Sequence, residues 1–249
     1  MFRRVLMVGA LLALLAPIAS AETVDEVLAK YIAARGGMDK IKAVKSVKVT
    51  GKMVMGGGQM EAPFVQMKRR PSDSRTEFVF QGLTGVQAYD GTGAVAWNIM
   101  PFMGKKDPEK MSADDAKALA DDAPIAGALI GAKERGDKVE YLGTEDVDGT
   151  EAHKLKVTLK NGDVDYVFLD PDHFLEIRMV AQRYVRGTQS ERTTDYGDYE
   201  EVNGVYFPFA MTSESKGGDG GKQQTTIEHA EANAPIEDSV FAFPAGKAH

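Results

Sequence analysis

Apolar residues recur at every second position along most of this chain, and this period predicts β-strands. Val47, Val49, Met53 and Met55 share one face of the first such segment, residues 46–55. Turn dipeptides such as Asn161-Gly162 separate many of the later segments. The other segments are 59–69, 75–81, 85–89, 94–99, 138–146, 153–160, 163–170, 175–185, 189–202, 205–215 and 223–233. The pattern predicts an antiparallel meander of about 11 strands with one dry and one solvated face.

Three segments have helical spacing instead. Thr23 and Glu26 form a capping box, and the helix that they open ends at the glycines of positions 36–37. Residues 38–44 predict a second short helix. Inside the segment 107–132, Ser112 is a candidate N-cap, and Ile125, Leu129 and Ile130 indicate another short helix. No Pro/Ser-rich linker divides the chain, so we expect residues 22–249 to form one domain.

A meander of this length needs cover for its inner face and its edges. Too few residues have helical spacing to cover a flat sheet on both sides. We therefore expect a mainly β (α+β) fold, a curved antiparallel sheet that forms an open, incompletely closed β-barrel of about 11 strands. The helices would form a lid or plug over an apolar cavity.

Residues 1–21 have the organisation of a cleaved signal peptide. Arg3 and Arg4 precede an apolar stretch, residues 5–16, and Ala19-Ser20-Ala21 is a small-x-small cleavage site. The apolar stretch is shorter than the ~20 residues of a membrane-spanning helix. Glu22 follows the cleavage site in place of the cysteine that lipid modification requires. We expect a periplasmic, soluble product that is not lipid-anchored.

Composition and charge argue against several function classes. The chain has 249 residues, 30 basic and 37 acidic, for a net charge of −7. Removal of Arg3 and Arg4 leaves 28 basic residues and a charge of about −9. An acidic chain without a basic cluster is not expected to bind nucleic acid.

The residue pattern contains no recognisable catalytic or metal site. There is no cysteine, and the four histidines lie far apart in sequence. No G-x-S-x-G motif, P-loop or paired-histidine motif is present. Carboxylate pairs such as Asp121/Asp122 and Asp163/Asp165 are typical of solvated caps and turns. We expect no enzyme activity, no cofactor and no metal.

Methionine is abundant on the faces that alternation marks as apolar. Ten of the 12 methionines follow residue 21. Methionine adapts its shape to irregular apolar partners, but methionine content alone favours an ordinary methionine-rich core. Together with the expected open barrel and helical lid, the pattern favours an apolar ligand cavity. The candidate cavity residues are Val49, Met53, Met55, Met67, Phe78, Phe80, Trp97, Met100, Phe102, Ile125, Leu129, Leu155, Val157, Phe168, Met179, Phe209 and Met211. Met100 and Phe102 of this set belong to the loop 100–104, which is either a gate at the cavity mouth or a hydrophobic contact that fastens residues 107–132.

Several segments, in their order along the chain, resemble the periplasmic outer-membrane lipoprotein-sorting (LolA/LolB-like) superfamily. They are Tyr31–Met38 with Ile41–Gly51, Tyr89–Gly91 with Trp97–Phe102, Val139–Gly143 with Val147–Thr150, Lys154–Val157, Asp195–Tyr199 with Val202–Phe209, and Pro235–Phe241. The resemblance covers nearly all of residues 23–244. It implies an open barrel of about 11 strands with a helical lid over an apolar cavity. A buried arginine holds the lid of the classical carrier shut, and no arginine here lies on a matching motif.

The resemblance implies a non-enzymatic carrier of lipid, of lipoprotein acyl chains or of another apolar ligand between the envelope membranes. An inner-membrane exporter and an outer-membrane acceptor would be its partners. The chain is longer than the classical carrier, so a free lipid or a sterol-like molecule is at least as well supported as a lipoprotein. The alternatives are an envelope protein-interaction or stress-sensing module of the same fold and, third, a lipid hydrolase. A monomer is favoured.

Overall fold

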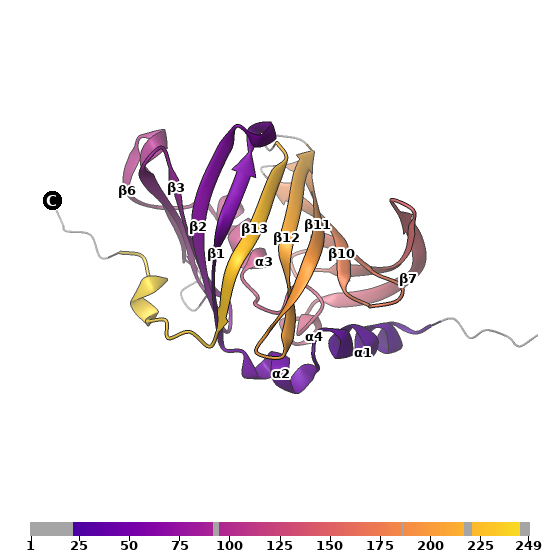
Figure 1. The fold of residues 1–249 in the computed structure, drawn as a ribbon. Helices are drawn as coiled ribbons and strands as arrows, with labels where there is room; N and C mark the ends of the chain where they lie inside the picture. Colours follow the sequence, from indigo (N-terminus) through magenta and orange to yellow (C-terminus); the bar gives the residue numbers. More distant parts are fainter. Residues whose placement is uncertain (1–21, 92–94, 186, 217–220, 245–249) are drawn as a thin grey trace, which may run out of the picture.

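The computed structural model describes residues 22–91, 95–185, 187–216 and 221–244. The expected signal peptide, residues 1–21, lies outside the described residues. Thirteen strands form one sheet in the order β6-β5-β4-β3-β2-β1-β13-β12-β11-β10-β9-β8-β7 (Figure 1). The pairing of neighbouring strands is antiparallel, and β6 and β7 are the edges, so the sheet is open rather than closed into a barrel. The open, curved β fold predicted from the sequence is confirmed.

Strand positions follow the two-residue period closely. The strands are β1 (Ser46–Met55), β2 (Met60–Arg69), β3 (Asp73–Phe80), β4 (Leu83–Asp90), β5 (Val95–Met100), β6 (Lys105–Lys110), β7 (Lys138–Val147), β8 (Thr150–Thr158), β9 (Val164–Leu169), β10 (Glu176–Val185), β11 (Thr188–Val202), β12 (Val205–Lys216) and β13 (Gln223–Ala232). The prediction of about 11 strands is too low. It assigned most of β6 to the helical segment because Lys-Lys-Asp-Pro-Glu-Lys has no apolar alternation. Charged residues and proline suit an edge strand.

The helices are α1 (Val24–Ala34), α2 (Met38–Ala43), α3 (Ala113–Asp122) and α4 (Ala132–Arg135), with short 3₁₀ turns η1 (Gly56–Gly58), η2 (Pro101–Met103) and η3 (Asp238–Val240). The capping box of Thr23 and Glu26 is present, and the Ser112 hydroxyl accepts from the Asp115 N–H at 3.2 Å. The short helix expected at residues 125–130 is wrong. This segment forms turns, because Gly127 and Gly131 adopt left-handed φ values of 80° and 75°.

A seam divides the sheet between β12 and β13. These two strands pair only from Ala210–Thr226 to Ser213–Gln223, whereas β12 pairs with β11 over nearly its whole length. Pro208 has no N–H for a ladder. Where β12 is not paired with β13, Arg35 supplies hydrogen bonds instead. Its carbonyl accepts from the Tyr206 N–H at 3.1 Å, and its Nε donates to the Tyr206 carbonyl at 2.7 Å. We call β13 with β1–β6 the N-lobe and β7–β12 the C-lobe.

The main core lies on one side of this sheet, which we call the inner face. Helix α1 contributes Val27 and Tyr31, both fully buried, and the turns at 125–130 contribute Leu129 and Ile130. They pack on strand residues that include Val47, Val49, Phe64, Leu155, Val157, Val167, Leu169 and Val205. The C-lobe part of the inner face is therefore filled by the protein's own side chains. The opposite side is the outer face, where a smaller cluster surrounds Trp97.

Candidate functional site

The predicted cavity residues divide into four groups. Val49, Leu129, Leu155 and Val157 are at most 7% exposed and belong to the main core. Partly buried side chains that pack against this core are Met53, Phe78, Ile125 and Met179. The structure thus brings these eight residues together on the inner face. The four buried ones are packed into the core itself.

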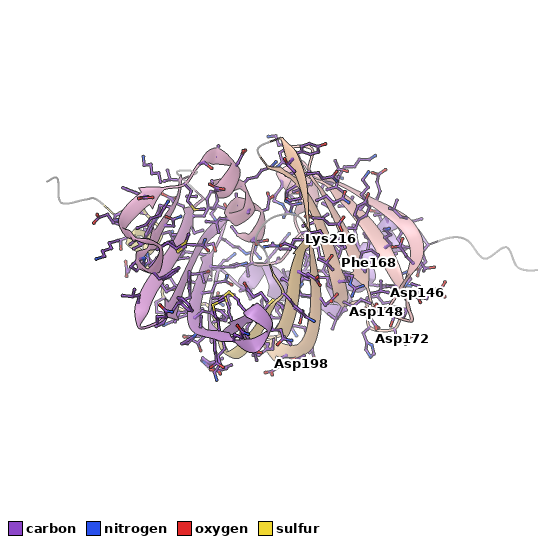
Figure 2. All side chains as sticks on the ribbon, turned by 90° about the horizontal axis from the view of Figure 1, so that it is seen from above. Asp146, Asp148, Phe168, Asp172, Asp198 and Lys216 are labelled. Carbon is purple, nitrogen blue, oxygen red and sulfur yellow. The ribbon has the colours of Figure 1, made fainter. Side chains whose placement is uncertain are left out.

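Three predicted residues, Met67, Trp97 and Phe168, lie on the outer face instead. The Trp97 indole N–H donates to the Phe241 carbonyl at 2.9 Å, and Met67 pairs with Arg75, whose guanidinium lies 5.2 Å from the Trp97 ring. Phe168 follows the core residue Val167 and therefore points to the other side of β9, into a separate cluster among the C-lobe strands (Figure 2). Alternation shows which residues share a face, but it does not show which face is the inner one.

The remaining predicted residues of the N-lobe gather where the hairpins β3–β4 and β5–β6 end. The Phe102 ring lies 5.7 Å from that of Phe78 and 5.6 Å from that of Phe80. Met100 is 7% exposed. These contacts fasten the loop 100–104 to the sheet. Met55 lies on the neighbouring hairpin, opposite Met60.

A row of partly exposed side chains crosses the seam on the inner face. Register places Met53 of β1 beside Thr225 of β13, Thr225 beside Met211 of β12, and Met211 beside Tyr196 of β11. The Tyr196 hydroxyl lies 3.9 Å from the Met179 sulfur. Phe209, 7% exposed, precedes Met211 on the same face of β12. Adaptable apolar side chains therefore line the middle of the inner face without being fully buried.

A polar row, which the sequence pattern did not predict, continues this face across the N-lobe. Gln66, Thr76, Gln87 and Asn98 are register neighbours on β2, β3, β4 and β5. The Gln66 amide donates to the Thr76 hydroxyl at 3.2 Å. The Asn98 Oδ1 atom is buried and has no hydrogen-bond partner among the described residues. The inner face thus offers an apolar surface and amide groups side by side.

Helix α3 crosses the inner face and is fastened by charge, with no fully buried residue among the ten that it contains. Arg183 Nε lies 2.7 Å from Asp121 of α3, and Lys117 of α3 lies 2.6 Å from Asp163. At the end of α3, Asp122 pairs with Arg192 at 2.8 Å and its carbonyl accepts from Lys68 of the N-lobe at 2.5 Å. The helix also packs against β4 and β5. It therefore bridges the two lobes.

Arg183 is the centre of this network and was not predicted from the sequence. Its NH1 group lies 2.6 Å from Asp165, in addition to the contact with Asp121, and its side chain is 13% exposed. The interpretation of Asp121/Asp122 and Asp163/Asp165 as solvated caps and turns is corrected by these contacts. The partners lie tens of residues apart in sequence, so no local motif marks them.

Burial acts against the charge of these carboxylates. It raises the pKa of Asp121 to about 6 although Arg183 lowers it, and it also raises the pKa of Asp165. The folded protein therefore binds a proton on Asp121 more tightly than the unfolded chain does.

Acidification will consequently add stability through Asp121. A pKa raised from 3.8 to about 6 corresponds to about 3 kcal/mol once the pH is below 3.8, and about 2 kcal/mol of this is gained as the pH falls from 7.5 to 4.5. Urea unfolding of the wild type and Asp121→Asn at both pH values measures this, with the variant as control. We expect the free energy of unfolding of the wild type, relative to the variant, to rise at pH 4.5. A relative fall would mean that Arg183 dominates and lowers the pKa.

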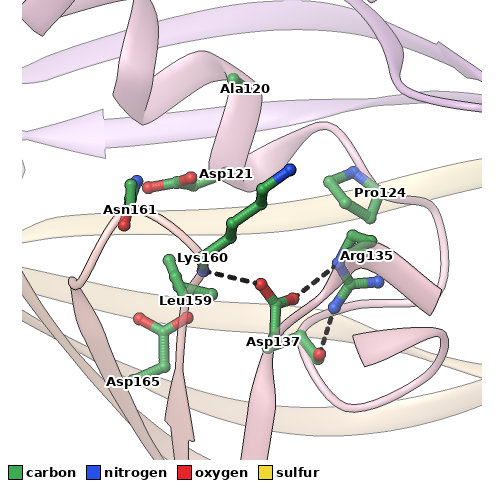
Figure 3. Close-up of a pocket in the computed structure, with 10 residues that line it drawn as sticks. Ala120, Asp121, Pro124, Arg135, Asp137, Leu159, Lys160, Asn161 and Asp165 are labelled. Atoms are coloured by element: carbon green, nitrogen blue, oxygen red, sulfur yellow. Dashed lines mark hydrogen bonds and ion pairs between the residues drawn. The ribbon is translucent and has the colours of Figure 1, made fainter. Parts of the chain in front are cut away.

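Two hollows adjoin this network and the seam. One, of about 440 Å³, lies between α3, α4 and the β8–β9 turn, where Asp121, Asp165, Lys160 and Arg135 surround the apolar side chains of Pro124 and Leu159 (Figure 3). Arg135 bonds to Asp137 and to the carbonyls of Ala128 and Ile130. The other, of about 420 Å³, is at the seam, and most of its lining residues alternate with the row of Tyr196, Met211 and Thr225, so it opens mainly on the outer face; these residues are Asp195, Gly197, Ala210, Thr212, Gln224 and Thr226. Both hollows have mixed polar and apolar walls.

The described part of the chain contains no group of three or more His, Cys, Asp or Glu side chains placed to hold a metal ion. No helix in the described ranges has the length and apolar character needed to cross a membrane.

Known structures show the same architecture at low sequence identity. A LolA superfamily protein from Nitrosomonas europaea is 14% identical, covers 89% of this chain and 98% of its own, and superposes with a TM-score of 0.59. A DUF1329 family protein from Desulfovibrio piger is 13% identical over 89% of this chain and 98% of its own, with a TM-score of 0.56.

A putative outer membrane lipoprotein-sorting protein domain from Vibrio parahaemolyticus is 14% identical over 87% of this chain and 94% of its own, with a TM-score of 0.55. By sequence, no family model and no curated protein matches. The shared architecture, rather than the sequence, shows that this chain has a LolA/LolB-like fold.

Proposed function

We propose that this protein is a soluble periplasmic carrier of a lipid, of lipoprotein acyl chains or of another apolar ligand, which it binds on the inner face beside α3. The observation that carries the proposal is the partly exposed row of Met53, Met211 and Tyr196 across the seam. Each Å² of apolar ligand surface that leaves water there contributes about 25 cal/mol. The polar row of Gln66, Thr76, Gln87 and Asn98 would receive a ligand's polar group.

The attachment of α3 supports exchange of a ligand. A helix whose residues are all at least partly exposed leaves the sheet without uncovering a hydrophobic core of its own. Its ion pair with Arg192 is exposed, and its pairs with Arg183 and Asp163 are largely buried. Movement of the helix returns these charges to water, and the regained hydration offsets part of the lost attraction. Helix α3 is therefore the element that we expect to move during loading and release.

The cellular role follows from the same proposal. The signal peptide of residues 1–21 would direct the chain to the periplasm. There it would receive its ligand from an inner-membrane exporter and deliver it to an outer-membrane acceptor. The chemistry is burial and release, so no enzyme activity is required.

Substitutions in the methionine row test the proposal. The double variant Met53→Gln/Met211→Gln keeps side-chain length while replacing the apolar ends by amides. We expect its affinity for a fluorescent fatty-acid probe to fall about tenfold, because two apolar contacts of roughly 0.7 kcal/mol each are lost. Native mass spectrometry of the protein purified from its own envelope then shows whether lipid remains bound.

Met67→Gln is the matched control, because Met67 lies on the outer face of the adjacent β2. It should leave probe affinity and lipid content unchanged. A wild-type protein that carries no lipid and takes up neither a fatty-acid nor a sterol probe would overturn the proposal. That result would favour the protein-interaction module.

A further inference from the structure

Exposed apolar side chains concentrate at one end of the N-lobe. In the described part of the chain, Met60, Val79, Leu83 and Met103 are 38%, 39%, 43% and 69% exposed. The other exposed large apolar residues, Leu142, Tyr184 and Tyr206, lie on the C-lobe strands β7, β10 and β12. Grouping of this kind marks an interaction surface, whereas single exposed apolar residues are ordinary.

Strand topology explains why these residues meet. Strands β1 to β6 are consecutive and antiparallel, so the turns β1–β2, β3–β4 and β5–β6 all leave the sheet at the same end. In Figure 1 this end of the N-lobe lies at the top, where the ends of the strands labelled β1, β2, β3 and β6 project. We call residues 55–60, 79–85 and 100–106 the apolar tip.

Contacts below the apolar tip hold it in place. Phe102 packs against Phe78 and Phe80, and it fits because Gly85 has no side chain, where a Cβ would lie 2.9 Å from the Phe102 ring. Gly104 then turns the chain with a left-handed φ of 80°. Met103 is therefore exposed next to an anchored aromatic residue, and its exposure is a built feature of the loop.

Charge distinguishes the apolar tip from the rest of the molecule. The chain has 37 acidic and 30 basic residues, yet the apolar tip contains Lys105 and Lys106 and no Asp or Glu. Three acidic residues lie just beyond it: Glu109 pairs with Lys105 at 2.8 Å, Glu61 pairs with Lys52 at 3.3 Å, and Asp107 is exposed. The tip is thus a small cationic and apolar region on an acidic protein.

We propose that the apolar tip docks on the surface of an anionic phospholipid bilayer. Met103, Leu83 and Met60 enter the boundary between headgroups and acyl chains, and Lys106 with Lys105 contacts lipid phosphates. Separate projecting turns suit insertion between lipids. A stable protein partner, in contrast, usually needs one larger, continuous patch of surface. The acidic remainder of the surface is repelled by the same membrane, so it favours an end-on orientation. Docking does not depend on whether the inner face holds a ligand.

Vesicle binding by surface variants tests the docking. The wild type should sediment with vesicles of phosphatidylglycerol and phosphatidylethanolamine, and less with phosphatidylcholine vesicles. Leu83→Asp/Met103→Asp should weaken binding to the anionic vesicles about tenfold or more. The matched control Leu142→Asp/Tyr184→Asp changes two exposed apolar residues of the C-lobe and should bind as the wild type does. Equal losses in both double variants would overturn the proposal.

The absence of cysteine from the chain permits a direct measurement of insertion. Met103→Cys carries a single environment-sensitive fluorophore, and Leu142→Cys provides the control position. We expect a blue shift on adding anionic vesicles at position 103 and none at 142. Two results contradict docking on lipid: no shift at 103, or a shift at 103 without vesicles that depends on protein concentration. The latter would identify a second copy of the chain as the occupant of the apolar tip. Near-ultraviolet circular dichroism confirms that each variant is folded.

Discussion

Arg35→Met will lower the free energy of unfolding by about 3–5 kcal/mol, because it leaves a buried carboxylate without its cation. The Arg35 side chain is 4% exposed and lies 3.1 Å from the Glu176 carboxylate, which is 12% exposed. Tyr31 donates to the same carboxylate at 2.8 Å. Arg35 also holds the Tyr206 carbonyl at the seam. Urea unfolding at pH 7.5 measures the loss.

The double variant Arg35→Met/Glu176→Met separates charge from packing. Removal of both charges eliminates the uncompensated carboxylate, so the double variant should be clearly more stable than Arg35→Met alone. Equal destabilisation of the two variants would mean that the bonds from Arg35 to the backbone of β12, rather than its charge pair, carry the effect.

Gly36→Ala should destabilise the protein by about 4 kcal/mol or prevent folding. An added Cβ would lie 2.0 Å from the Gly204 carbonyl oxygen, and the φ of 112° is strained for any residue with a side chain. The backbone at this point fills the seam beside the start of β12, so it has no room to retreat. Thermal and urea unfolding measure the change.

Gly37→Ala is the matched control for Gly36. Its φ is 93°, but an added Cβ meets no atom within 4 Å. The variant should therefore lose only about 1–3 kcal/mol of unfolding free energy, which is the cost of backbone strain. The same loss in both variants would show that conformational strain, and not the close approach to β12, makes Gly36 necessary.

Local sequence patterns predicted the secondary-structure elements, which depend mainly on residues close together in the chain. The capping box at Thr23 and the alternation of most strands gave the elements, and the resemblance to the LolA/LolB-like superfamily agreed with the fold. The charged strand β6 was missed because strands were predicted from the alternation of apolar and polar residues, and its charged sequence has no such alternation. The turns at 125–130 were mistaken for a helix, since apolar spacing outweighed Gly127.

The candidate site was less accessible from the sequence because it depends on long-range register. The row of Gln66, Thr76, Gln87 and Asn98 exists only once four strands are aligned. Arg35 and Glu176 are separated by 141 positions, and Arg183 and Asp121 by 62. Alternation alone likewise did not distinguish the inner face from the outer one for Trp97 and Met67.

The short pairing of β12 with β13 makes the boundary between the two lobes a mechanically weak line of the sheet. Only Ala210–Ser213 joins the two lobes through this ladder, whereas eleven register pairs between Glu191 and Val202 join β11 to β12. Bending at this joint breaks fewer hydrogen bonds than bending at the β11–β12 ladder, so the sheet has a built-in flexure line between its lobes. Met211 and Thr225 lie on this line, one on each side. A change in the angle between the two lobes would therefore change the width of the inner face at the seam. If the inner face binds ligand as proposed, this surface would accept apolar ligands of different widths.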